Sequence, residues 1–492
     1  MTALDAATPL PFQTARALRN ALDRREISAV ELLDEQLAHY EAVNPAINAI
    51  VATDPDTARA AAKAADAAMA RGDAGPLAGI PMTIKDVFEV VGMPATCGFP
   101  ELANHYPARD ADAVAALRAA GAVIWGKSNV PTGAVDHQSV NPVYGLTRNP
   151  WNHEHSPGGS SGGAAAAVAA GITALELGSD IGGSIRVPSH FSGVYGMKPS
   201  FGIVSGRGHI PPMPGARGKT PLGVYGPMAR SAFDLEWMLD LVVGPDAWDR
   251  KAYSIKLPPA RQERLRDFRV GIWLDAYPLD DGYRAAIETM LDGIERAGGQ
   301  IDRKARPDID PASQYETYLT VLMALEGAGA TDADYAAQVG AGKAAEPGSY
   351  AELIGTRMAQ NVRSLGAGQA RQEDLMNRWE AFFRDYDLLI CPIFPRVAFP
   401  HATTGDGHMA QYERKIIVNG KPIPYLDGLM WPGMATLPGL PAAAVPTGEL
   451  VEGLPSAVQI IGPSLEDRTP LRFAQLLEQT MGSGYRIPPA YR

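Results

Sequence analysis

Apolar residues recur at helical spacing through the first 75 residues of the chain. One helix is predicted to begin after Ser28, because Ser28 and Glu31 form a capping-box pattern in front of an apolar stripe. A second helix is predicted from Asp54 to about Gly72, since Asp caps helices, the following Pro fits the first helical position and Gly commonly ends them. Residues 1–75 are therefore expected to form an N-terminal helical segment that packs on a larger core.

Short apolar runs alternate with helical patterns from about residue 76 onward. Because strands separated by helices build sheets that helices cover, this alternation predicts an α/β fold. The expected architecture is a single large domain over residues 76–492, with a central twisted, mostly mixed β-sheet and helices on both faces. Residues 325–370 are rich in Ala and Gly with weak helical periodicity, which predicts an irregular helical insertion. The strand candidates are 79–84, 122–126, 269–274 and 388–393.

Composition and charge exclude several classes of protein. Of the 492 residues, 46% are hydrophobic, which allows a large core and excludes global disorder. The net charge of −11 argues against broad nucleic-acid binding and against docking on anionic membranes. No long apolar run predicts a transmembrane helix, and residues 1–12 lack the pattern of a signal peptide. The two cysteines, Cys97 and Cys391, are too few for a disulfide scaffold and favour a reducing, cytoplasmic location.

The most informative of the 51 glycines lie in two clusters. Residues 156–164 read SPGGSSGGA, and residues 178–186 read GSDIGGSIR. A flexible linker is disfavoured because the first cluster runs directly into an Ala-rich, helix-prone segment. Successive glycines let backbone N–H groups converge on an anion, either a phosphate or a reaction oxyanion. A phosphate loop is disfavoured because no Gly-Lys-Ser/Thr follows.

A rival motif lies inside the first cluster. The residues from Gly158 to Gly162 match the G-x-S-x-G nucleophile elbow of α/β-hydrolases, with Ser160 as the nucleophile. That elbow needs a buried strand immediately before it, whereas residues 152–157 are polar and turn-forming. An α/β-hydrolase-type esterase therefore stays as an alternative of lower weight.

The paired glycine clusters resemble the amidase signature family of serine hydrolases. Ser160 and Ser184 stand 24 positions apart, which is the spacing of that family. The resemblance spans about residues 25–235 and 385–480, and it implies the amidase signature fold and a stand-alone, bacterial-type amidase. Further matching stretches are 79–86, 126–129, 144–152, 196–199, 226–231 and 437–462.

The resemblance implies a Ser–Ser–Lys catalytic triad. Carried over to this chain, Ser184 is the nucleophile, Ser160 the bridging serine and Lys85 the base. A lysine accepts a proton only when it is neutral, and burial beside apolar strand residues lowers the pKa of a lysine. Ser160 would then relay the proton between Ser184 and Lys85. The peptide bond between Gly159 and Ser160 is expected to be cis, as in the family.

The same resemblance assigns the loop around the nucleophile. Backbone N–H groups are expected to form an oxyanion hole, because glycines let a carbonyl oxygen approach the main chain closely. Asp180, Arg186 and Ser161 are expected to support this loop by hydrogen bonds rather than to take part in the chemistry. The expected oxyanion-hole residues are Ile181, Gly182, Gly183 and Ser184.

One stretch departs from the family pattern. Many relatives carry a Glu-Phe pair shortly after the position of Asn129, whereas this chain has small residues followed by His137. Gly133, Ala134 and His137 are therefore expected to line the substrate pocket.

The expected function is hydrolysis of small-molecule carboxamides through a Ser184 acyl-enzyme, with aryl esters, anilides and carbamates as further substrates of the same route. The alternative within the family is the A subunit of a tRNA-dependent amidotransferase, which needs partner subunits.

No metal or cofactor is expected, because no Cys, Asp or Glu cluster completes the His pair at 153 and 155. The expected partner is a small amide substrate, without nucleic acid or membrane, and the chain is expected to be a monomer or homodimer.

Overall fold

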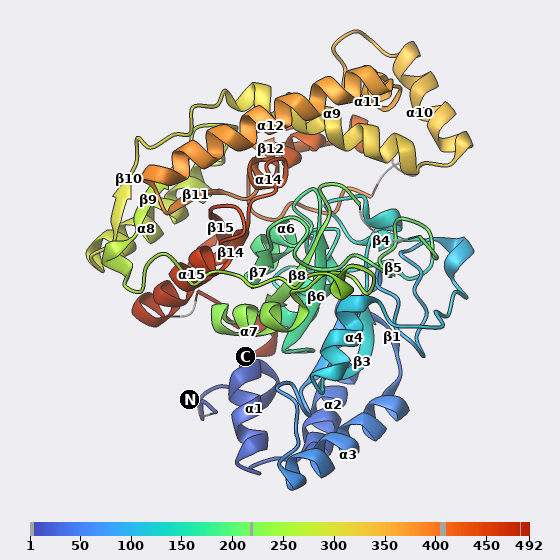
Figure 1. Ribbon diagram of the computed structural model, residues 1–492, viewed down its shortest axis with the longest axis vertical. Helices are drawn as coiled ribbons and strands as arrows, with labels where there is room; N and C mark the ends of the chain where they lie inside the picture. The colour runs from blue at the N-terminus through green and yellow to red at the C-terminus, as the bar shows by residue number, and fades with distance from the viewer. Residues whose placement is uncertain (1–3, 217–219, 404–409, 483) are drawn as a thin grey trace.

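The computed structural model describes residues 4–216, 220–403, 410–482 and 484–492, and its centre is an 11-stranded mixed β-sheet (Figure 1). Two small two-stranded sheets, β4 (Val140–Asn141) with β5 (Gly145–Leu146) and β12 (Lys415–Val418) with β13 (Lys421–Pro424), are also present. The expected α/β fold with a mixed sheet flanked by helices is confirmed. In spatial order, the large sheet consists of β1 (Ile50–Thr53), β3 (Val123–Ser128), β2 (Pro81–Lys85), β6 (Leu175–Asp180), β8 (Val224–Ala229), β7 (Tyr195–Lys198), β14 (Ala442–Val451), β15 (Leu454–Ile461), β11 (Leu388–Pro392), β9 (Arg269–Ile272) and β10 (Gln300–Asp302).

Helices pack against this sheet in two groups. Helices α5 and α6 contact each other and the strands near the centre of the sheet, while α15 contacts α7, α8 and β14. The α-helices are α1 (Ala15–Asp23), α2 (Ala29–Ile47), α3 (Pro55–Arg71), α4 (Asp112–Ala119), α5 (Gly162–Ala169), α6 (Arg186–Ser192), α7 (Ala232–Val242), α8 (Asp281–Arg296), α9 (Pro311–Gly329), α10 (Asp332–Ala344), α11 (Tyr350–Met358), α12 (Val362–Asp385), α13 (Ala410–Glu413), α14 (Met430–Thr436) and α15 (Arg468–Met481).

The local sequence explains the N-terminal helices. The Ser28 Oγ accepts a hydrogen bond from the Glu31 N–H at 3.2 Å, and the Glu31 carboxylate accepts one from the Ser28 N–H at 2.9 Å. Helix α3 begins after its N-cap Asp54 and ends at Gly72, which adopts the left-handed conformation. The predictions for both helices are confirmed. The segment also contributes β1, which pairs antiparallel with β3 and is too short to show a periodic pattern.

Helices α9 to α12 form a layer at one end of the sheet, at the top of Figure 1. The sequence predicts an irregular helical insertion over 325–370, whereas the structure has regular helices over 311–385 with short turns between them. Glycines explain the weak periodicity, because α10 and α11 pack through them. A Cβ on Gly342 would lie 2.7 Å from the Cα of Gly355.

The order of strands places the carboxyl ends of β2 and β6 side by side. Strands β2 and β6 are adjacent and parallel, with Thr83 opposite Glu176. Strand β2 ends at Lys85 and β6 ends at Asp180. Because parallel neighbours end at the same edge of a sheet, the first glycine cluster, the second cluster and Lys85 meet there. Among the described helices, none is both long and apolar enough to span a bilayer.

Candidate functional site

Lys85 is the buried cation of the site. Its side chain is 0% exposed, and its Nζ donates hydrogen bonds to the Oγ of Ser160 at 2.7 Å and to the Oγ of Ser179 at 2.9 Å. Burial lowers the pKa of Lys85 to about 7, although the charges of Asp180 and Glu176 act in the opposite direction. A large fraction of Lys85 is therefore neutral near pH 7, so the amine can accept a proton.

Ser160 lies in a turn that only glycine can build. The Gly159–Ser160 peptide bond is cis, as expected from the resemblance. A Cβ on Gly159 would lie 2.3 Å from the carbonyl oxygen of Asp136, so no larger residue fits at this position. The Oγ of Ser139 holds the turn from the other side, because it donates to the Gly158 carbonyl at 3.2 Å and accepts from the Gly162 N–H at 3.1 Å.

Ser184 lies between the end of β6 and the start of α6. Its side chain is 7% exposed, against 1% for Ser160 and 0% for Lys85, so it is the most accessible of the three. The Ser161 N–H donates to the Ser184 carbonyl at 3.1 Å, which joins the two glycine-rich loops. The structure thus gathers Lys85, Ser160 and Ser184 at one edge of the sheet, with Ser160 in direct contact with the lysine.

A buried ion pair holds the loop that follows β6. Arg186 donates from Nε to Asp180 at 3.0 Å and from a terminal nitrogen at 2.8 Å, and both side chains are fully buried. Burial favours the neutral carboxyl, but Arg186 outweighs it and lowers the pKa of Asp180 to about 2. Arg186 also donates to the Pro432 carbonyl at 2.9 Å and to Gln459 at 2.7 Å. The expected supporting contacts of Asp180 and Arg186 are present.

The backbone N–H groups of this loop are not all free. The Gly183 N–H donates to Asp180 at 3.0 Å, so it is already engaged, unlike the expectation that it forms part of an oxyanion hole. Within the described residues, no acceptor is found for the N–H groups of Ile181, Gly182 and Ser184. Three of the four expected donors therefore remain available.

The stretch expected to line the pocket packs beside the cis peptide. The Gln138 N would lie 2.6 Å from a Cβ on Gly159, which places the neighbouring His137 near this turn. The His137 ring contacts the rings of Phe394 and Tyr425 at centroid distances of 5.3 and 6.0 Å, and burial lowers its pKa to about 4. His137 is therefore neutral at physiological pH. Gly133 and Ala134 lie in a short turn, where the Gly133 N–H donates to the Cys97 carbonyl at 2.9 Å.

Three further polar residues contribute to the surroundings of the site, and they differ in how far the sequence indicates them. Ser179 accepts from Lys85, and Glu176 accepts from the Thr83 hydroxyl at 2.9 Å one strand away. Tyr318 on α9 donates to the Ile181 carbonyl at 2.8 Å. Ser179 belongs to the second glycine cluster and was open to prediction, whereas Tyr318 is distant in sequence and has no local signal.

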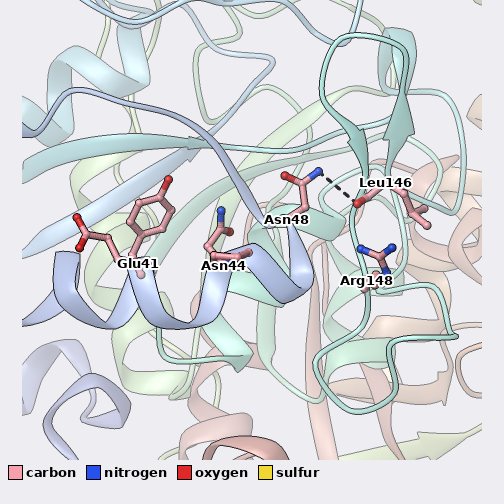
Figure 2. A pocket seen from close by; sticks show the side chains of 7 residues that line it. Glu41, Asn44, Asn48, Leu146 and Arg148 are labelled. Atoms are coloured by element: carbon pink, nitrogen blue, oxygen red, sulfur yellow. Dashed lines mark hydrogen bonds between the residues drawn. The ribbon is translucent and has the colours of Figure 1, made fainter.

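One surface concavity lies away from these residues. It has a volume of about 540 Å³ and is formed by the end of α2 and β5, with Glu41, Asn44, Asn48 and Arg148 on its walls (Figure 2). Asn48 closes one side by donating to the Leu146 carbonyl at 3.3 Å. None of the three candidate catalytic residues lines it. Among the described residues, no cluster of three His, Cys, Asp or Glu side chains could hold a metal ion.

Comparison with known proteins defines the class. The profile of the family described as Amidase matches residues 31–471, and the chain belongs to this amidase signature family. It is 33% identical over 513 residues to the A subunit of the Glutamyl-tRNA(Gln) amidotransferase from Roseiflexus castenholzii, with 98% of each chain covered. The corresponding polypeptide of Deinococcus radiodurans, which bears the same name, is 33% identical over 506 residues, covering 95% of this chain and 97% of that one.

Solved structures agree on the fold. The 6-aminohexanoate cyclic dimer hydrolase complexed with substrate is 27% identical, with a TM-score of 0.77 and coverage of 98% of this chain and 100% of that one. A bacterial aryl acylamidase of the amidase signature family superposes with a TM-score of 0.81 at 24% identity, covering 98% and 99%. At that identity, the aryl acylamidase supports the fold alone.

Proposed function

We propose that this chain cleaves carboxamides through an acyl-enzyme on Ser184. The contact that carries the proposal is the 2.7 Å hydrogen bond between the Nζ of Lys85 and the Oγ of Ser160, in a site where burial lowers the lysine pKa to about 7. Membership of the amidase family supports the same reaction. Lys85 would act as the base, Ser160 as the relay and Ser184 as the nucleophile.

The proposed proton route is balanced through both half-reactions. Neutral Lys85 accepts the Ser160 proton while Ser160 accepts the Ser184 proton, and the Ser184 oxygen bonds to the amide carbon. The proton returns through Ser160 to the leaving nitrogen as the C–N bond breaks, releasing ammonia or an amine. Water then attacks the carbonyl carbon of the Ser184 acyl ester, and its proton passes through Ser160 to Lys85. The proton returns through Ser160 to the Ser184 oxygen as the ester bond breaks, and the carboxylic acid leaves.

We propose a narrower oxyanion hole than the sequence suggests. The N–H groups of Ile181, Gly182 and Ser184 are the free donors, while Gly183 is held by Asp180. Such preorganised donors stabilise the tetrahedral oxygen most strongly where water is excluded. Gly133, Ala134 and His137 remain the proposed substrate-facing residues, and of these His137 lies between the two residues that pack on Gly159.

Two uses of this chemistry are proposed. The first is as the A subunit of an amidotransferase that acts on glutamyl-tRNA(Gln), since the curated relatives carry that name across nearly the full length of both chains. These relatives favour the amidotransferase role over the stand-alone amidase expected from the sequence. The net charge of −11 suits a polypeptide that leaves tRNA contacts to basic partners.

The second use is hydrolysis of small amides by the chain alone. The specific observation in its favour is the full-length similarity to the 6-aminohexanoate cyclic dimer hydrolase. Purified chain that turns over small amides without other subunits would support this use. Turnover that appears only in a stable complex with other subunits would support the first.

Fluorophosphonate labelling with peptide mapping tests the chemistry common to both. Label on Ser184 is expected, with loss of the label in Ser184→Ala. Label on Ser160 in the Ser184→Ala and wild-type proteins would instead support the esterase alternative and overturn the proposed roles.

A further inference from the structure

A second ionisable group lies on the same face of the sheet as Lys85. Strands β2 and β6 are parallel neighbours with Thr83 opposite Glu176, and Lys85 stands two positions after Thr83. Because alternate residues of a strand point to the same face, the side chains of Thr83, Lys85 and Glu176 share one face. Strand spacing and rise place the Cα atoms of Lys85 and Glu176 about 8 Å apart. The register of the two strands therefore brings a carboxyl group close to the proposed base.

Hydrogen bonds hold the Glu176 carboxyl in the interior. Glu176 is 0% exposed, and its carboxyl accepts from the Thr83 hydroxyl at 2.9 Å and from the Leu177 N–H at 3.0 Å. Burial raises the pKa of Glu176 to about 7, while the hydroxyl groups of Ser128 and Thr83 act in the opposite direction. Above that pH the carboxylate is charged, and its charge opposes the effect of burial on the pKa of Lys85.

Three further ionisable groups of the described structure lie near Lys85: Asp180, Cys97 and His209. Burial favours the neutral form of Asp180, but its ion pair lowers the pKa of this carboxyl to about 2, so its charge is constant at neutral pH. Burial raises the pKa of the Cys97 thiol and lowers the pKa of His209 to about 3, so both groups are neutral there. Of these groups and Glu176, only Glu176 changes its charge near pH 7.

Few charges face Glu176 from the elements packed against it. Strand β3 contributes Lys127, which pairs with Asp86 at 2.9 Å. Strand β8 places Met228 opposite Glu176, and helix α5 consists only of Gly, Ala and Val. Lys127 thus has its own counter-charge, whereas Lys85 forms no ion pair among the described residues.

We propose that Glu176 is a positioning residue that acts on the reaction through Lys85: its carboxylate stabilises the protonated amine and so sets the pH above which the enzyme is active. The proposal rests on the proposed role of Lys85 as the base and adds the group that controls its proton. Lys85 must hold the proton after Ser184 attacks and return it to the leaving nitrogen. A buried ammonium ion is unfavourable, and a carboxylate one strand away lowers that cost without a direct contact that would fix the proton.

The rate of fluorophosphonate labelling at Ser184 between pH 5.5 and pH 9 tests this role, because the probe has no group that titrates there. In the wild type the rate is expected to rise with a midpoint near pH 7. Glu176→Gln keeps the size of the side chain and removes its charge. Its midpoint should move down by about half a pH unit or more, so that at pH 6 it keeps about threefold more of its own plateau rate than the wild type does.

Glu478→Gln is the matched control. Glu478 on α15 also accepts from one hydroxyl, that of Ser231 at 3.1 Å, and from one N–H, that of Ala232 at 2.8 Å, and burial raises its pKa to about 7 as well. Helix α15 packs on α7, α8 and β14, so this substitution should leave the midpoint unchanged. Glu176→Asp keeps the charge and should return the midpoint most of the way to the wild-type value.

The position of the midpoint separates this role from a structural one. The same midpoint in Glu176→Gln and in the wild type, whatever the plateau rate, would overturn the proposal, because a purely structural residue changes the rate equally at every pH. If Glu176→Gln does not fold, as judged by far-UV circular dichroism, the wild type decides alone. Its rise should extend over a wider pH range than a single-proton curve, since two interacting groups titrate there, and a single-proton rise would contradict the proposal. Absence of label on Ser184, or a rate that does not rise with pH, would overturn the proposed function instead.

Discussion

The Nζ of Lys85 lies 2.7 Å from the Oγ of Ser160, and both residues are more deeply buried than Ser184. An ammonium ion is costly in such a place unless it is paired, and Lys85 makes no ion pair among the described residues. Its two shortest contacts are hydroxyl groups, which can donate to a neutral amine as well as accept from an ammonium ion. The arrangement therefore suits proton exchange at Lys85 rather than a fixed positive charge.

Removal of single members of the trio should separate their roles. Ser184→Ala is expected to lower kcat by about 10⁴-fold or more, since no other nucleophile is in place. Lys85→Ala should have a similar effect, and Ser160→Ala a large but smaller one. Steady-state turnover of an amide substrate measures all three, with far-UV circular dichroism as the folding control. A Ser184→Ala protein that keeps more than a few per cent of activity would contradict the assignment.

The pH dependence should follow the Lys85 amine. Burial lowers its pKa to about 7, so the amine is charged below that pH and neutral above it. Because only the neutral form accepts a proton, kcat/KM is expected to rise from pH 6 to pH 8 and then level off. The profile is measured with a neutral amide, whose own charge stays constant over this range. A profile that falls over this range would exclude Lys85 as the base.

Burial of the same lysine should lower the free energy of unfolding at low pH, and this destabilisation should fade as the pH rises from 7 to 10.5. Its pKa is about 7 when folded and 10.5 as the reference value, so the unfolded chain binds more protons between these limits. The free energy of unfolding of the wild type, relative to Lys85→Met, is therefore expected to increase as pH rises from 7 to 10.5. Urea unfolding at pH 7, 8.5 and 10 measures the difference. A difference that stays constant would mean that Lys85 keeps its proton in the folded state.

Breaking the buried ion pair should mainly affect stability. Asp180→Asn leaves Arg186 buried without a counter-charge, which costs about 3–5 kcal/mol. Chemical denaturation is expected to show that loss. The exposed pair of Arg378 and Asp374 provides the control, since Asp374→Asn should cost less than about 1 kcal/mol. Equal effects at the two sites would show that Arg186 finds other partners.

Local signals explain which parts of the fold are predictable. The sequence places helix α3 correctly because its cap, its Pro and its terminal Gly all lie in the segment itself. Strands β14 and β15 are not among the predicted strands, because Ala and Pro fill much of β14 and both strands are largely buried, so no alternation appears. A short stretch of sequence also cannot show which strands pair, since β14 lies beside β7, about 250 residues earlier in the chain.

In the candidate site, too, local motifs indicate some features and only the three-dimensional structure shows the others. Motifs point to Lys85, Ser160 and Ser184, and the cis peptide comes with them. The engagement of the Gly183 N–H depends on where the Asp180 carboxylate points, which spacing does not give. The Tyr318 contact joins residues 137 positions apart and required the three-dimensional structure.

That contact leads to a final prediction about positioning. The Tyr318 hydroxyl donates to the Ile181 carbonyl and so orients the peptide between Ile181 and Gly182. The N–H of that peptide, on Gly182, is one of the proposed oxyanion donors. Tyr318→Phe keeps the ring against Gly433 and removes only the hydrogen bond, which is worth about 0.5–1.5 kcal/mol. The expected result is a two- to tenfold lower kcat with KM unchanged, because the oxyanion exists only in the transition state. Tyr315→Phe is the matched control, since the Tyr315 hydroxyl donates to the Leu426 carbonyl at 2.8 Å from the same helix and should leave kcat unaffected. If both variants change KM rather than kcat, α9 shapes substrate binding and Tyr318 does not position the oxyanion loop.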